Sequence, residues 1–483
     1  MTPLAAALAA AAIDALVVGI VGEPVSLDPH RATDLLSAAI VGNVCEPLVR
    51  YSSDGARPEP ALATAWATRD ARRWTFTLRE GVRFHDGALF DADAVLANLA
   101  SIARVRAFPG VAERVGSHLV AITLDRPNAA LLATLSQPFF AMQSPRELAR
   151  GGSLPVGTGP FRLVAVKDSG VQLEAYRGYW RGAPLIARLV FPRIADERAL
   201  FEGLLAGQID VAPAVSHDHI ERLRAHDDVL LQARTGGNIA FLALNNERPP
   251  LDDRRVRLAI AHAIDRPALV ARILGGHGEL ARNPLPPALW GYGRSTPELV
   301  LDRTVARRLL KEAGHAQGFA ASLLVADAPR PYNPDPLGLA RALATALGEI
   351  GVAVRIDRAA SWSAFLERAT RGAYDMAVMG WQADTPDPND FLSVLLGSEF
   401  VGATNRSRYR SPAMDILLKQ GRRGDDQRER MASYLQAQAL FRRDMPWVPL
   451  FHVSVFTVHR RNVHGLAIGP TGIPRYDRVW KKA

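Results

Sequence analysis

Ile239-Ala-Phe-Leu-Ala-Leu-Asn245 is the stretch that decides the fold, because it is apolar almost from end to end. A continuous apolar run without alternation predicts a strand that is buried on both faces. Directly after it, Val256, Ile260 and Ile264 recur at helical spacing and predict a helix. Further helix patterns cover 304–313, 338–350, 362–370 and 428–441, and further strand patterns cover 321–326, 352–356, 374–381 and 447–459. This alternation of strand and helix predicts an α/β lobe.

The N-terminal half is richer in strand patterns. Trp74–Leu78 and Val82–Phe84, separated at Glu80-Gly81, predict a β-hairpin. Asp91 then opens a helix that runs through Leu99, since a side-chain acceptor favours a helix start. Further strands are expected at 16–21, 118–124, 161–166, 171–176 and 187–194, and a helix at 196–206.

The bulk numbers indicate a globular protein of more than one domain. The chain has 483 residues, 48% of them apolar and 22% charged, and this length predicts two or three domains. The net charge is +9, but only five of the 58 basic residues are lysines and the arginines are scattered. Without a basic run or a nucleic-acid motif, we expect no nucleic-acid partner.

Motifs of common enzymes are missing from the sequence. There is no H-E-x-x-H, no G-x-S-x-G and no complete phosphate loop. Gly157-Thr-Gly-Pro160 is interpreted as a tight turn into a strand, because Pro160 has no N–H to offer a phosphate. The single cysteine, Cys45, lies in an apolar stretch and is expected to be a buried structural thiol.

A metal site is the alternative reading of a histidine-rich segment. His217 and His219 flank Asp218, and we interpret Asp218 with Glu221 as a capping box at a helix start. The sequence therefore predicts no catalytic residue, no metal site and no cofactor. At the N-terminus, residues 1–15 include an Ala-rich apolar stretch that is interpreted as a possible remnant of a secretion signal.

Several motifs occur in one order along nearly the whole chain. They are Leu27-Asp-Pro-His30, Glu46-Pro-Leu48, Pro60–Trp66, Trp74–Gly81, Phe84-His-Asp-Gly87, Gly157–Phe161, Tyr179-Trp180, Asp253–Arg266 and Gly380-Trp-Gln-Ala-Asp384. In this order they resemble the bacterial extracellular solute-binding protein family 5, whose members serve peptide, opine and nickel ABC importers. Cys45 departs from the family pattern, which usually has an aromatic residue there.

A narrower resemblance concerns two segments, Arg330-Pro-Tyr-Asn-Pro334 and Gly380–Asp384, which look like the dipeptide-binding branch. That resemblance implies that Arg330 grips the ligand carboxylate, that Asp384 takes the ligand ammonium, and that Gly380, Trp381 and Gln382 line the site. Further candidate ligand contacts are Tyr332, Thr33 and Asp34.

The chemistry of these residue types fits a zwitterionic ligand. A guanidinium fork suits a terminal carboxylate, and a carboxylate suits an ammonium. Arg330 and Asp384 can reach one site if the strands before them end side by side. Backbone amides near Gln382 could also pair with an extended ligand as an added strand. We further expect the two charges to lie on separate halves of the molecule.

The resemblance implies an α/β, two-lobed periplasmic-binding-protein fold of class II with an extra N-terminal subdomain. Lobe one is expected from residues 16–45, 156–240 and 450–483, the subdomain from 46–155 and lobe two from 241–449, with crossings near Leu244 and Pro449.

The implied function is that of a periplasmic, monomeric receptor. It would capture dipeptides or short oligopeptides between two closing lobes and dock on an inner-membrane ABC permease. Two alternatives stay open: the same fold with an opine, nickel or metal chelate, heme or other non-peptide solute, and an enzyme that uses a carboxylate of the site.

Overall fold

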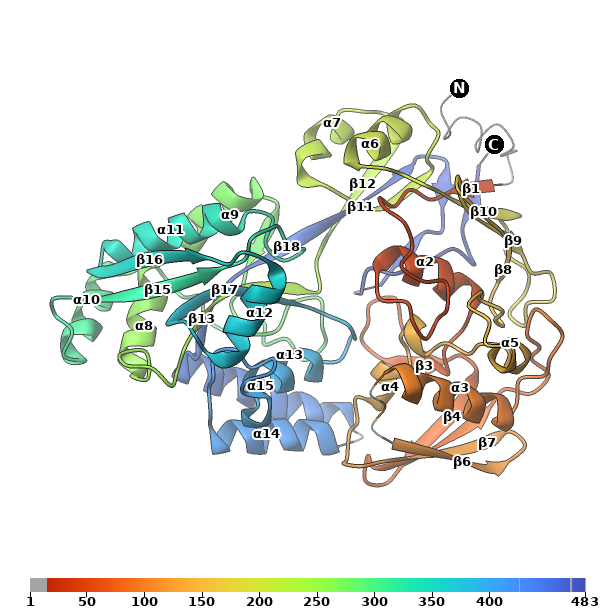
Figure 1. The fold of residues 1–483 in the computed structure, drawn as a ribbon, viewed down its shortest axis with the longest axis horizontal. Helices are drawn as coiled ribbons and strands as arrows, with labels where there is room; N and C mark the ends of the chain where they lie inside the picture. The colour runs from red at the N-terminus through yellow and green to blue at the C-terminus, as the bar shows by residue number, and fades with distance from the viewer. Residues whose placement is uncertain (1–14, 107, 109, 425, 470, 483) are drawn as a thin grey trace. The chain divides into compact units, whose positions relative to one another are not determined.

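The chain divides into two compact units (Figure 1). This computed structural model describes residues 15–106, 108, 110–424, 426–469 and 471–482, so most of the possible signal remnant lies outside the described residues. Unit 1 takes the described residues up to Arg234 and those from Val455 onward, and unit 2 is Thr235–Ser454. The chain therefore leaves unit 1 and later returns to it.

Unit 2 is built on a sheet with the order β18-β13-β17-β15-β16, and β14 pairs with β18. Its strands are β13 Asn238–Leu244, β14 Gly278–Leu280, β15 Phe319–Val325, β16 Val352–Arg358, β17 Met376–Gln382 and the first part of β18 Trp447–Arg460. Its helices are α8 Arg254–Ala263, α9 Arg266–Leu274, α10 Arg303–Glu312, α11 Pro336–Gly348, α12 Trp362–Arg371, α13 Asn389–Leu396, η3 Ser398–Phe400, α14 Pro412–Arg423 and α15 Gln427–Asp444.

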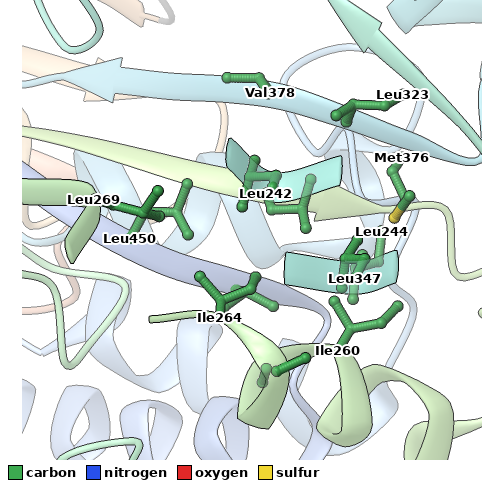
Figure 2. Close-up of a cluster of buried hydrophobic side chains, with 14 of the residues drawn as sticks. Leu242, Leu244, Ile260, Ile264, Leu269, Leu323, Leu347, Met376, Val378 and Leu450 are labelled. Atoms are coloured by element: carbon green, nitrogen blue, oxygen red, sulfur yellow. The ribbon is translucent and has the colours of Figure 1, made fainter. Parts of the chain in front are cut away.

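Strand β13 is buried on both faces, as predicted from its sequence. Its side chains alternate between two apolar clusters. Ala240, Leu242 and Leu244 pack with the helices α8 to α11 on one face of the sheet, and Figure 2 shows Leu242 and Leu244 in this cluster. Ile239 and Phe241 pack on the other face with α12 to α15. Helices on both faces explain why this strand is apolar throughout rather than at every second position.

Unit 1 contains two four-stranded sheets. Their orders are β1-β10-β9-β8 and β4-β5-β7-β6. The strands of unit 1 are β1 Ala15–Val17, β2 Val49–Tyr51, β3 Pro58–Pro60, β4 Ala63–Thr68, β5 Arg73–Leu78, β6 Gly110–Gly116, β7 Leu119–Leu124, β8 Phe161–Lys167, β9 Gly170–Ala175, β10 Arg188–Pro192, β11 Val211–Val215, most of β12 Val229–Thr235, the end of β18, β19 Val463–His464, β20 Ala467–Ile468, β21 Pro474–Arg475 and β22 Trp480–Lys481. Its helices are α2 Leu35–Val44, α3 Ala92–Val105, α4 Leu131–Thr134, η1 Pro138–Phe140, α5 Pro145–Ala149, α6 Glu197–Leu205, η2 His217–His219 and α7 Ile220–Arg224.

The sheet β4-β5-β7-β6 has an apolar core of its own, formed by residues between Leu48 and Met142. This range agrees with the segment predicted as a subdomain, although the three-part division of the chain stays a prediction. The two chain crossings lie at Arg234–Thr235 and Ser454–Val455, not near Leu244 and Pro449. The reason is that β13 and Trp447–Phe451 pair with each other inside unit 2.

One local prediction is wrong. β5 does not form a hairpin with 82–84, because its neighbours are β4 and β7. The segment at Val82 instead turns back on itself, and the Phe90 N–H donates to the Val82 carbonyl over 3.0 Å. The helix start interpreted at Asp218 is present as the 3-10 turn η2 followed by α7, and His219 stacks on Phe201. The capping box of Asp218 and Glu221 stays a prediction.

The interpretation of Cys45 as a buried structural thiol is confirmed. Cys45 has no exposed surface and ends helix α2, and burial raises the pKa of its thiol well above the ordinary range. Beside it, Glu46 is a buried carboxylate held by three donors, the Thr158 hydroxyl at 3.0 Å, the Tyr179 hydroxyl at 2.7 Å and the Trp180 indole N–H at 2.7 Å. These bonds fix the end of α2 to the segments around 158 and 180.

Candidate functional site

Two parallel strands of unit 2 bring the predicted ligand-binding segments to one edge of the sheet. β15 and β17 are neighbours, with Leu323 opposite Met376. The turn at Arg330 follows β15 and Asp384 follows β17, and parallel strands end at the same edge. The strands that precede Arg330 and Asp384 are therefore neighbours, which was the condition for both residues to reach one site. The expectation that the two charges lie on separate halves is wrong, because both residues belong to unit 2.

Arg330 is held in a tight turn before helix α11. Its N–H donates to the Asn333 carbonyl over 2.9 Å, and the Asn333 N–H donates back over 2.8 Å. The guanidinium carbon lies 3.7 Å from the centre of the Trp362 ring, a cation–π contact, and Asp327 is 4.0 Å away. The buried Nε of Arg330 has no hydrogen-bond acceptor among the described residues. The stacking orients the guanidinium and leaves this donor for another group.

Tyr332 packs directly on Gly380, which explains the glycine. A Cβ at position 380 would lie 2.1 Å from the Tyr332 ring and 2.5 Å from the Ile239 carbonyl oxygen. Any side chain there would therefore push the Arg330 turn away from β17. Burial raises the pKa of Tyr332 to about 12, so its phenol stays protonated at neutral pH.

The end of β17 has a strand partner on one side only. β13 pairs with it as far as Gln382, opposite Asn238. β15 pairs only with Met376 and Ala377, so within the described residues no strand pairs with Gly380–Gln382 on that side. Gln382 is exposed, and the buried indole N–H of Trp381 has no acceptor among the described residues. This arrangement is compatible with the predicted addition of an extended ligand.

Asp384 is exposed and directly follows β17. Its backbone N–H donates to Oδ2 of Asp390 over 2.7 Å, and the Thr385 N–H donates to the same oxygen over 3.1 Å. Burial, and next the charge of Asp384, raise the pKa of Asp390 to about 7. The Asp390 carboxylate therefore holds the main chain from which the Asp384 side chain extends.

The last two candidates, Thr33 and Asp34, belong to unit 1. Thr33 is exposed, and Asp34 caps helix α2, where its carboxylate accepts the Ser37 N–H at 2.9 Å and the Val25 N–H at 3.1 Å. A ligand would have to compete with these bonds for Asp34, whereas Thr33 has no such constraint. Both stay predictions.

Sequence reasoning missed two residues of this region, Trp362 and Asp390. Trp362 starts a predicted helix, and no pattern in the sequence indicates that Arg330 stacks on its ring. Asp390 could have been noticed as the third acidic residue after β17, following Asp384 and Asp387. Over the described residues, no group of three His, Cys, Asp or Glu is arranged to hold a metal ion, and no helix has the length and apolar character needed to cross a membrane.

Comparisons with known proteins bear on the family and on the fold. The profile of the bacterial extracellular solute-binding proteins, family 5 Middle, matches residues 57–402. Heme-binding protein A of Haemophilus influenzae is 30% identical, covering 90% of this chain and 85% of its own, and the dipeptide-binding protein of Escherichia coli is 29% identical, covering 89% and 88%.

Solved structures show the same fold over nearly the whole chain. HbpA2 from Haemophilus parasuis matches with a TM-score of 0.92 at 28% identity, covering 97% of this chain and all of its own. A dipeptide-binding protein from Pseudoalteromonas sp. SM9913 in complex with Met-Leu matches with a TM-score of 0.77 at 28% identity and the same coverage. The predicted α/β binding-protein fold is confirmed, and the chain belongs to the bacterial extracellular solute-binding proteins, family 5.

Proposed function

We propose that this chain is the periplasmic substrate-binding receptor of an ABC importer, that it captures dipeptides or short oligopeptides, and that it does so as a monomer with an inner-membrane permease as its partner. The observation that carries the proposal is the shared sheet edge, where the Arg330 guanidinium and the Asp384 carboxylate follow neighbouring parallel strands. The names of relatives such as the E. coli dipeptide-binding protein support the ligand class.

The proposed contacts follow from the chemistry of a peptide. A free peptide has an ammonium at one end and a carboxylate at the other, at a distance set by about 3.3–3.6 Å per extended residue. Asp384 would accept the ammonium and Arg330 would donate to the carboxylate, with its guanidinium oriented by Trp362. The open side of Gly380–Gln382 would bind the ligand main chain. Affinity would then come from the termini and the backbone, which every short peptide shares.

The first prediction concerns the ammonium contact. Asp384→Ala should weaken dipeptide binding at least tenfold, or about 1.4 kcal/mol, because it removes the counter-charge of the ammonium. Isothermal titration calorimetry with a panel of dipeptides measures this change. Asp252→Ala is a matched control, since Asp252 is also exposed but follows the other end of the sheet, after β13.

Two outcomes would count against the proposal. Unchanged affinity of Asp384→Ala for every peptide would remove Asp384 from the site. A wild-type protein that binds none of the di- and tripeptides tested would remove the peptide function itself. We also propose that binding involves no turnover, which mass spectrometry of the bound peptide after long incubation checks directly.

Heme is a second candidate ligand, and one finding favours it. One of the relatives with 30% identity is named heme-binding protein A. Titration of the protein into heme, followed by the Soret absorbance, would separate the two ligand classes when it is run beside the peptide titrations.

A further inference from the structure

Asp390, a residue of the first turn of helix α13, holds the segment that follows β17 by hydrogen bonds to its main chain. A single oxygen of this carboxylate accepts two consecutive backbone N–H groups, those of Asp384 at 2.7 Å and Thr385 at 3.1 Å. Because the next residue is Pro386, these are the last two N–H donors before Asp387. The direction in which the Asp384 side chain leaves the main chain therefore depends on Asp390.

The neighbouring carboxylate, Asp387, has a different role. It has no exposed surface and forms a buried ion pair with Arg430 over 2.8 Å. Arg430 also contacts the Tyr434 hydroxyl at 3.2 Å. Asp387 therefore anchors the loop to helix α15 with its charge compensated. Asp390, in contrast, forms no ion pair with a basic side chain of the described residues.

The electrostatics of Asp390 follow from this position. Burial comes first among the causes that raise its pKa to about 7, the negative charge of Asp384 comes second, and Asp387 adds to the effect. The two N–H bonds oppose the rise because they favour the ionised form. Near neutral pH, Asp390 is therefore divided between its neutral and charged forms.

We propose that Asp390 is a positioning residue for the ligand's cationic group: by accepting the Asp384 and Thr385 N–H groups it holds the main chain from which the Asp384 carboxylate meets that group. This inference rests on the proposed function, in which Asp384 accepts an ammonium. An ammonium compensates the charge of Asp384, and the repulsion that adds to burial in raising the pKa of Asp390 then falls. Binding near neutral pH releases a proton, and affinity for the cationic group rises as Asp390 ionises.

The positioning is tested first without any ligand, by hydrogen–deuterium exchange of the full-length protein. In Asp390→Ala the amides of Asp384 and Thr385 should exchange at least about tenfold faster, since they lose their acceptor. Asp390→Asn retains an amide oxygen and should keep both amides protected. Asp415→Ala is the matched control, because Asp415 also lies in the first turn of a helix and accepts a distant backbone N–H, that of Ser398 at 2.9 Å.

The coupling between ligand binding and the ionisation of Asp390 is tested by dipeptide titrations at pH 6, 7 and 8. The ratio of wild-type to Asp390→Asn affinity should rise about threefold or more from pH 6 to pH 8, because only the wild type can ionise at 390. Titration of the peptide amine is common to both proteins and cancels in the ratio. Calorimetry of the wild type in buffers of different ionisation enthalpy should also show proton release, and Asp390→Asn should release less.

The outcomes separate this inference from the proposed function. If dipeptides bind, Asp384→Ala weakens them and Asp390→Ala changes neither the exchange nor the affinity, the inference is wrong and the function stands. If exchange follows the expected pattern but no dipeptide binds, the positioning stands and the peptide function fails. A pH-independent affinity ratio in a protein that binds dipeptides would overturn the coupling.

Discussion

At the scale of single residues, a strong constraint comes from Glu46, a buried carboxyl group without an ion-pair partner among the described residues. Glu46 is 3% exposed, and its two oxygens accept from Thr158, Tyr179 and Trp180. Burial raises the pKa of Glu46, because a charged carboxylate is poorly solvated there. Its charged form therefore costs stability, while its acceptor oxygens are needed by three buried donors.

The second prediction separates these two effects. Glu46→Ala should lower the free energy of unfolding by at least about 3 kcal/mol, since it leaves three buried donors without an acceptor. Glu46→Gln should cost far less, because its oxygen can face the Trp180 N–H and the Thr158 hydroxyl while its amide donates to the Tyr179 oxygen. Urea unfolding of the three proteins measures the difference.

The pH dependence of the stability difference between Glu46→Gln and wild type follows from the direction in which the pKa of Glu46 is shifted. A pKa that is raised in the folded state gives stability that is present at low pH and lost as pH rises through the folded pKa. The stability of Glu46→Gln relative to wild type should therefore increase from pH 5 to pH 8. An equal loss in the Gln and Ala variants would contradict the acceptor argument.

The residues of the candidate site were predictable only in part. Gly380, Trp381 and Asp384 could be placed at a strand end from the apolar run before them, and β17 confirms that placement. The stacking of Arg330 on Trp362 could not be predicted, because it depends on how the turn after β15 meets a helix that begins 32 positions later. The capping role of Asp34 could not be distinguished from a ligand-binding role, because an Asp directly before a helix is suited to both.

At the scale of elements, the close approach of the turn 157–160 to the end of α2 matters more than its sequence suggests. A Cβ on Gly157 would lie 2.1 Å from the Val44 carbonyl oxygen, and one on Gly159 would lie 2.7 Å from it. The Gly159 N–H donates to the same oxygen over 2.9 Å. The glycines therefore allow two backbones to touch, a role unrelated to phosphate binding.

The third prediction uses this contact. Gly157→Ala should destabilise the protein by about 1–3 kcal/mol or more, because the main chain of α2 has no side chain to move aside. Gly348→Ala is the opposite case, since its added Cβ meets nothing within 4 Å and it ends helix α11. That variant should be neutral or more stable by up to about 1 kcal/mol. Thermal unfolding of both variants shows whether the signs differ.

Helices with a clear start signal and hydrophobic period in the sequence were predicted well. The pairing of strands that lie far apart in the sequence was not. Asp196 caps α6 and Asp91 caps α3, as their sequence positions indicate. The wrong hairpin at β5 has a clear cause: the strand that pairs with it on the downstream side, β7, lies about 45 residues further along the chain, across helix α3. Strand pairing over such a separation leaves no local pattern in the sequence.

At the scale of the whole molecule, the two units differ in how the chain builds them. Unit 2 is one continuous segment with two apolar clusters of its own, whereas unit 1 needs residues from both ends of the described chain. The crossings could be predicted only to within about ten residues, because the long apolar strand β18 continues through one of them without a break in its sequence pattern.

The fourth prediction follows from this organisation. A fragment of residues Thr235–Ser454 should fold alone and unfold cooperatively, since it contains two apolar clusters and the paired strands β13 to β17. A fragment that ends at Arg234 should be much less stable, because it lacks the buried Tyr476 and Val479. Circular dichroism during thermal unfolding compares them. A non-cooperative transition of the first fragment would show that unit 2 depends on unit 1.

The contacts of helix α2 with the end of the chain bear on the order in which the protein is made. Asn43 accepts the Tyr476 N–H over 3.1 Å and donates to the Pro474 carbonyl over 3.4 Å, across 431 residues, and Lys481 pairs with Asp210 over 2.9 Å. A ribosome therefore completes unit 2 before it supplies the residues that close unit 1. Until those residues are made, unit 1 lacks part of the apolar core that Tyr476 and Val479 share with helix α2.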